Sequence, residues 1–248
     1  MPLRQRRDLS QIIETTFGLY ARNFWPLLAI AAVVIPFGML SAVVTESLEP
    51  LGELPDDGGI PSGFYTALAV MVPLFLLQAF VGWLASLALI AAVLRVDSGQ
   101  RPEFSRAYEV VFRRFWTLVG AVLRAGVIVL LLLITIIGIP WAIQRLVRWL
   151  FVQQAVILDR TSARAALSYS ADAVSGSWWR TLGIMILLII IVQVPAQIIS
   201  APFALAPPLI SGTVSAALSA LALPLSAIGM TLLYFDLQAR RQAVAAGL

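Results

Sequence analysis

Three arginines inside long apolar stretches are the residues of this 248-residue chain whose chemistry most needs an explanation. A planar guanidinium makes paired hydrogen bonds to a phosphate or carboxylate, so several arginines in apolar surroundings are typical of an anion site. An ionised side chain inside a membrane is costly, which makes such a group a candidate functional site. We therefore predict an anion- or lipid-binding site formed by Arg124, Arg145, Arg148, Gln153 and Gln154.

A second interpretation of these arginines remains open. In this interpretation the side chains of Arg145 and Arg148 extend toward the outer face of the membrane and that of Arg124 toward the inner face, so that each charge reaches a polar interface. They could also hydrogen-bond to helix carbonyls freed near Pro140. The sequence does not choose between a binding site and this structural role.

Other polar residues in the apolar runs are expected to join helices. Amides inside a bilayer commonly hydrogen-bond to a neighbouring helix, and small residues at intervals of four let two helices approach closely. The first pattern comprises Gln78, Gln193 and Gln197, and the second Gly212, Ala216 and Ala220, beside Ser211, Ser215 and Ser219.

The composition excludes most catalytic chemistry. The chain contains no Cys and no His, so it has no thiol chemistry and lacks the commonest general base. Asp97, Asp159 and Asp236 each end an apolar run, but no nucleophile or metal-ligand motif accompanies them. We expect Asp97 and Asp159 to cap the next helix and Asp236 to pair with Arg240. The prediction is a protein that is not an enzyme and that needs no cofactor or metal.

The hydrophobicity of the chain predicts an integral membrane protein. Hydrophobic residues make up 60% of the sequence and charged residues only 12%. A membrane-spanning helix needs about 20 mostly apolar residues. The runs between charges predict six spans, at residues 26–44, 63–94, 117–137, 141–158, 181–201 and 209–235.

The distribution of arginine predicts the orientation. All 17 basic residues are Arg, which with the abundant Ala suggests a bacterial source. Apart from the three within the predicted spans, the arginines precede the first span, follow the last, or lie between the second and third or the fourth and fifth spans. Residues 46–62, in contrast, contain five acidic residues and no Arg. By the positive-inside rule, both termini are cytoplasmic in a bacterial plasma membrane. Because the arginines have this explanation, the basic balance does not indicate nucleic-acid binding.

One pattern occurs three times along the chain: an amphipathic segment, an aromatic pair and long apolar runs. The pairs are Phe24-Trp25, Phe115-Trp116 and Trp178-Trp179. Internal similarity of this kind indicates a repeated supersecondary unit. We predict an all-α integral membrane protein, a single domain of residues 1–248, whose six transmembrane helices form three parallel hairpin repeats (9–97, 104–159 and 167–236) with cytoplasmic amphipathic helices.

Three motifs together resemble a bacterial family. Residues 17–25 read FGLYARNFW, residues 164–180 begin RAALS and end WWR, and residues 233–240 read LYFDLQAR. This is similar to the membrane domain that precedes the catalytic domain in some glycerophosphoryl diester phosphodiesterases, and to its stand-alone relatives, in which an Arg often occupies the place of Gln238. The resemblance implies a multi-span membrane protein. The catalytic domain of that family uses His residues, and their absence here argues against hydrolase activity.

These observations lead to two main hypotheses of function. The first is a non-enzymatic protein that binds anionic phospholipid or a membrane protein partner, as an accessory to envelope lipid metabolism. The second is a transporter or lipid translocator that uses the three arginines as an anion site within the membrane. A polar path to both faces would favour the transporter, and an arginine pocket open to the side would favour lipid binding.

Overall fold

The chain forms only helices in the residues that its computed structural model describes, which are 3–48, 63–135 and 138–245. No strand occurs in these ranges, so the predicted all-α fold is confirmed. Apart from its first residues, the acidic loop at 46–62 lies outside the described residues. The helices are α1 (Leu9–Arg22), α2 (Phe24–Ala31), α3 (Val34–Leu48), α4 (Phe64–Asp97), α5 (Phe104–Arg113), α6 (Phe115–Leu133), α7 (Ile139–Arg148), α8 (Val152–Leu158), α9 (Ala163–Val174), α10 (Trp178–Ser200), the 3-10 turn η3 (Ala201–Leu205) and α11 (Pro208–Ala245).

Several helices are long and apolar enough to cross a membrane. In the described part of the chain they are α4, α6, α10 with η3, and α11, and the pair α2–α3 makes a fifth if its 41° bend is counted within one span. The structure therefore supports a multi-pass membrane protein with four or five such helices.

The predicted fourth span, 141–158, is not a single helix. It comprises α7 of 10 residues and α8 of 7 residues, separated by a turn at residues 149–151. Neither is long enough for a hydrocarbon layer of about 30 Å, which needs about 20 residues. The six predicted spans are thus not all present as continuous helices.

The bend between α2 and α3 has a cause in the sequence. Pro36 cannot donate to the carbonyl of Ala32, four residues before it, and its ring crowds that carbonyl. The helix is interrupted at Ala32, as expected for a proline kink. Beside the bend, the Tyr108 hydroxyl of α5 donates to the carbonyl of Ile30 at 3.0 Å. The amphipathic helix α5 therefore stabilises the end of α2.

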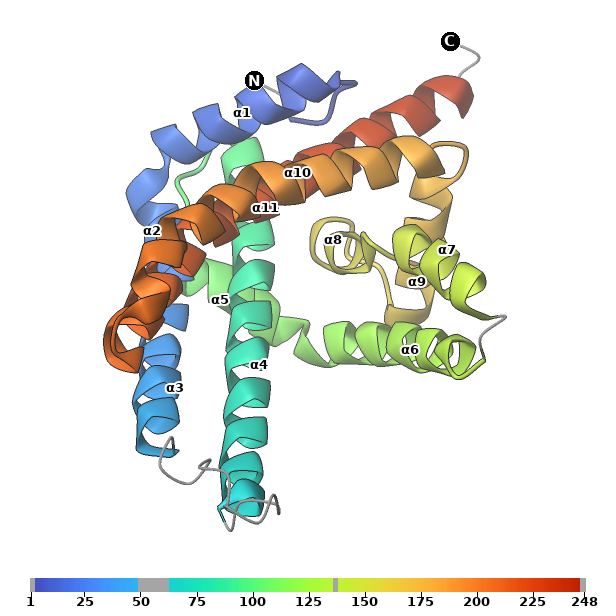
Figure 1. Ribbon diagram of the computed structural model, residues 1–248. Coiled ribbons are helices and arrows are strands. Elements are labelled where there is room, and N and C mark those ends of the chain that lie inside the picture. Colours follow the sequence, from blue (N-terminus) through green and yellow to red (C-terminus); the bar gives the residue numbers. More distant parts are fainter. Residues whose placement is uncertain (1–2, 49–62, 136–137, 246–248) are drawn as a thin grey trace.

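The core lies around the C-terminal half of α4, which stands at the centre of the molecule (Figure 1). The helices α2, α5, α8 and α11 contact it there. Its largest fully buried side chains come from several helices and the turn before α8, and include Leu87, Leu89, Phe151, Leu232, Tyr234 and Phe235. The core thus joins the first and last parts of the chain.

The three predicted amphipathic segments are helices, and each is followed by a break and then by an apolar helix. These are α1 before α2, α5 before α6, and α9 before α10. The second aromatic of each pair faces outward: Trp25, Trp116 and Trp179 keep 76%, 81% and 79% of their surface exposed. Tryptophans at the beginning of apolar helices are typical of a membrane interface.

The helices α3 and α11 make the closest crossing. A Cβ added at Gly38 would lie under 3.0 Å from the Cβ of Ala216, and one added at Gly212 would lie equally close to that of Ala42. Each helix thus presents a glycine and an alanine four residues apart to the same pair on its partner. The close contact expected around Gly212 and Ala216 is confirmed, and its partner is α3.

Candidate functional site

The first predicted site residue, Arg124, is exposed on α6 among apolar side chains. Its neighbours Leu123, Val127 and Ile128 are also exposed, and α6 is apolar enough to cross a membrane. One guanidinium nitrogen of Arg124 lies close to Gly120, one turn nearer the beginning of α6. The side chain therefore follows the helix back toward its N-terminal end, so the charge lies nearer the predicted cytoplasmic interface than the Cα does.

The other two arginines occupy the last turn of α7. Arg145 is exposed, and its guanidinium carbon lies 5.3 Å from the centroid of the Trp149 ring. Such a cation–π contact fixes the direction of the charge. Arg148 is half-buried, and its carbonyl accepts the hydroxyl of Ser170 at 2.8 Å, while the same hydroxyl oxygen accepts the N–H of Phe151 at 3.1 Å. Ser170 of α9 thereby holds the turn that carries both arginines.

The two predicted glutamines lie on α8 but in different surroundings. Gln153 lines a pocket of about 260 Å³ between α6 and the α7–α8 turn, which is otherwise apolar and includes Trp149. Gln154 is buried, and its side-chain oxygen has no hydrogen-bond partner among the described residues. The structure thus brings Gln153 to the same pocket as the tryptophan that carries Arg145. The remaining lining residues are Val122, Ala125, Gly126, Val129, Leu146, Leu150 and Val152.

The three arginines have no countercharge within the described residues. Their side chains make no ion pair or hydrogen bond there, whereas Arg106, Arg113 and Arg180 all pair with carboxylates. None of the three arginines lines the apolar pocket, although Arg145 stacks on Trp149, which is one of its lining residues. The arrangement supplies charge and hydrogen-bond donors, and it contains no group suited to acid–base catalysis.

A second polar centre joins the N-terminal strap, residues 3–8, to the ends of three helices. Leu3 donates its N–H to Asp97 at 2.9 Å, and the guanidinium of Arg4 lies 3.7 Å from Asp97 and 3.5 Å from Asp159. Asp159 also accepts the hydroxyl of Tyr234 and the amide of Gln238 at 2.8 Å. Two of the three recurring aspartates therefore bind the strap.

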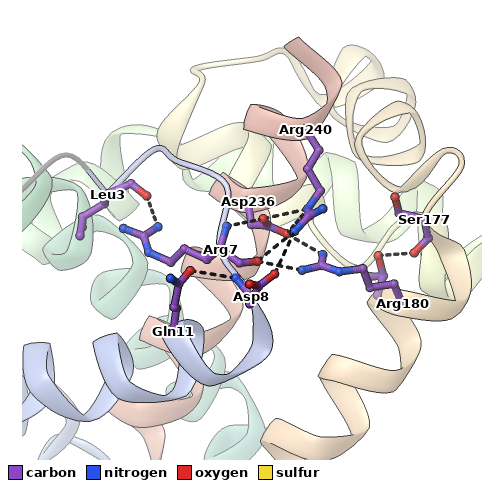
Figure 2. A network of polar contacts seen from close by, with 9 residues as sticks. Leu3, Arg7, Asp8, Gln11, Ser177, Arg180, Asp236 and Arg240 are labelled. Carbon is purple, nitrogen blue, oxygen red and sulfur yellow. Dashed lines mark hydrogen bonds and ion pairs between the residues drawn. The ribbon is translucent and has the colours of Figure 1, made fainter. Parts of the chain in front are cut away.

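The third aspartate, Asp236, is the buried centre of this network (Figure 2). It accepts the backbone N–H of Arg7 at 2.7 Å, a guanidinium nitrogen of Arg180 at 2.5 Å and Nε of Arg240 at 2.9 Å. Arg180 and Arg240 also donate to the carbonyl of Arg7, at 3.0 and 3.1 Å. The segment around Arg7 is thus held by α10 and α11 much as a bound peptide would be.

These contacts correct one prediction and confirm another. Asp97 and Asp159 do not cap the following helices, whose N-caps are Glu103 and Ser162. Their carboxylates are instead used by the strap, which supplies a backbone donor and a guanidinium. The predicted pair of Asp236 and Arg240 is present.

In α5 and the strap, the pKa values follow from burial and from pairing with neighbouring charges. Burial lowers the pKa of Arg7, and the carboxylates of Asp236 and Asp97 oppose that change. Hydrogen bonds from Arg106 and the charge of Arg113 lower the pKa of Glu109 on the exposed face of α5. Burial raises the pKa of Tyr108 to about 12.

The strap was missed by sequence reasoning because nothing in its local pattern indicates contacts with residues far along the chain. Leu3 and Arg7 are both buried, which their place in a basic terminal segment does not suggest. The one available signal was the recurrence of an aspartate at the end of three apolar runs, which pointed to a shared role. No family model, curated protein or solved structure matches the chain.

Proposed function

We propose that the protein is a non-enzymatic component of a bacterial plasma membrane that binds anionic phospholipid at the surface formed by α6, α7 and α8. In this proposal both termini are cytoplasmic, and the protein is an accessory to envelope lipid metabolism, alone or with a membrane protein partner. The resemblance to the membrane domain of glycerophosphoryl diester phosphodiesterases is part of the same proposal.

The observation that carries the proposal is that Arg124, Arg145 and Arg148 have no countercharge in the described residues, while an apolar pocket lies between the same helix, α6, and the α7–α8 turn. A lipid phosphate would supply the missing countercharge, and a guanidinium binds phosphate through two parallel hydrogen bonds. The pocket lined by Gln153 and Trp149 offers apolar surface to the acyl chains. Arg145 is already oriented by its contact with Trp149, which reduces the entropy lost on binding.

The exposure of Arg124 and Arg145 favours a lipid over a translocated solute. Both arginines lie on the outer surface of their helices, among apolar side chains that a bilayer would cover. A solute passage would need them to line an aqueous path. A bilayer, in contrast, brings phosphates to the polar interface beside such a surface.

Native mass spectrometry of the delipidated protein tests this proposal. Equal amounts of phosphatidylglycerol and phosphatidylethanolamine are added to the wild type and to the variant Arg124→Gln/Arg145→Gln/Arg148→Gln. The wild type is expected to retain mainly phosphatidylglycerol and the variant to lose that preference, since about three charge-assisted hydrogen bonds or more would be removed.

A matched control separates a site from general attraction of basic residues to anionic lipid. Arg22, Arg101 and Arg164 are exposed, and no ion pair is seen for them in the described part of the chain. Replacing these three by Gln removes the same charge, and the preference for phosphatidylglycerol is expected to persist. Equal binding by wild type and the site variant, with both folded by circular dichroism, would contradict the proposal.

A further inference from the structure

A polar groove between α3, α4, α10 and α11 is separate from the arginine surface. It encloses about 460 Å³, within the usual range of small-molecule sites, about 300–1,000 Å³. The close crossing of Gly38 and Gly212 with their alanine partners forms one side. Glutamine and serine side chains line it from all four helices: Ser41, Gln78, Gln193, Ser215 and Ser219.

These side chains have no hydrogen-bond partner within the described chain, which is the observation that points to a ligand. The predicted helix-joining bonds of Gln78 and Gln193 are not formed, although each amide carries two donors and an acceptor. Neighbouring hydroxyls behave differently: Thr45 and Thr213 donate to carbonyls four residues earlier in their own helices. A polar group left unpaired in an apolar medium costs several kcal/mol. Gln193, Ser215 and Ser219 are exposed, and Ser41 and Gln78 are half-buried, so their polar groups are open to whatever fills the groove, whether water or a ligand.

The groove selects against charge. Among the described residues, no Arg, Asp or Glu lines it, so an ion would be desolvated there without a countercharge. Amides and hydroxyls both donate and accept hydrogen bonds, and the groups that match them best do the same. Hydroxyl groups meet this requirement without carrying charge.

We propose that this groove binds an uncharged polyhydroxyl group, with the amides of Gln78 and Gln193 as its principal hydrogen-bonding partners. The group could belong to the sugar headgroup of a neutral glycolipid or to a free sugar. The site is independent of the arginine surface, because none of the groove residues lies on α6, α7 or α8.

The absence of cysteine makes the groove directly accessible to experiment. The single substitution Ser215→Cys is placed in otherwise wild-type protein in vesicles and reacted with the uncharged reagent hydroxyethyl methanethiosulfonate. Because the thiolate is the reactive form and needs a polar surrounding, a thiol in the groove should react at least about tenfold faster than one facing lipid. Leu131→Cys, on the exposed apolar face of α6, is the matched lipid-facing control.

Protection by a ligand then identifies the site and its source. Glucose is added to one sample, and glucosyl diacylglycerol is incorporated in the vesicles of another. We expect either glucose or the glycolipid, at about twice its own Kd or above, to slow the reaction of Ser215→Cys about threefold or more. The double substitution Gln78→Leu/Gln193→Leu should abolish that protection. Slowing by the glycolipid alone assigns the group to a membrane lipid, and slowing by glucose assigns it to a free solute.

Three results would overturn the inference. They are a Ser215→Cys rate equal to that of Leu131→Cys, a rate that neither probe changes, and protection that survives the loss of both glutamines. If the double variant does not fold, Gln193→Leu alone replaces it, because Gln193 is exposed and its loss leaves the helix contacts intact.

Discussion

The crossing of α3 and α11 gives the sharpest test of how the helices are held together. Replacing Gly38 by Ala adds one methyl group at the point where the Cβ of Ala216 already lies under 3.0 Å from the new atom. Two carbons pack best at about 3.5–4.0 Å, so the helices must separate by at least about 0.5 Å. The neighbouring contact of Gly212 with Ala42 would loosen at the same time.

The expected cost is that of overpacking a tight contact. Inserting a methylene into a well-packed site typically costs about 1–3 kcal/mol, although the exchange of Gly for Ala in a helix favours folding by about 0.5–1 kcal/mol. We therefore expect Gly38→Ala to lower the free energy of unfolding by about 1–2 kcal/mol net. For a chain of this size this corresponds to a fall in Tm of about 2–8 °C.

The measurement is thermal unfolding in mild detergent, followed by circular dichroism, with Gly183→Ala as the control. Gly183 lies in α10, and an added Cβ there meets nothing within 4 Å. The control should leave Tm unchanged or raise it. A Tm for Gly38→Ala equal to or above that of Gly183→Ala would refute the close crossing.

Two further predictions concern the strap and α5. Replacing Asp236 by Asn should lower the free energy of unfolding by about 3 kcal/mol. This is the lower end for a broken buried ion pair, because Arg180 and Arg240 keep 29% and 34% of their side-chain surface exposed. The surface variant Asp172→Asn should change stability by less than about 1 kcal/mol, and equal effects of the two variants in urea titration would contradict the network. Burial raises the pKa of Tyr108 to about 12, above its ordinary value of 10.0, so the folded state retains the proton that the unfolded state loses. Its contribution to stability is complete below pH 10 and is lost as the pH rises to 12. The Tm of the wild type should therefore fall more steeply than that of Tyr108→Phe over this range, and parallel curves would disprove the buried phenol.

The sequence predicted most of the helices because their signals are local. The amphipathic helices α1, α5 and α9 follow from the spacing of apolar residues, and the bend before α3 follows from Pro36. The segment 141–158 was predicted as one span because its many apolar side chains outweighed Gln144, Arg145 and Arg148, whereas the structure divides it into α7 and α8. Those residues make α7 an amphipathic helix of 10 residues.

The candidate sites were predictable only in part, because they depend on contacts between distant segments. The charges of Arg124, Arg145 and Arg148 were evident from their apolar surroundings, but the apolar pocket that Trp149 lines depends on how α6 packs against α7 and α8. The spacing of Gln78 and Gln193 could not show that both amides reach one groove. Likewise, nothing in the spacing of the aspartates shows that a terminal strap passes between them.

Photo-crosslinking locates the bound lipid and thereby tests the central proposal most directly. Phosphatidylglycerol with a diazirine in one acyl chain is added to the delipidated protein, and the sample is irradiated. Mass spectrometry of the protein's peptides then locates the crosslinked residues. Binding at the arginine surface predicts crosslinks within residues 122–153, which are lost in Arg124→Gln/Arg145→Gln/Arg148→Gln. Crosslinks spread evenly over the apolar helices, or unchanged in that variant, would contradict the account.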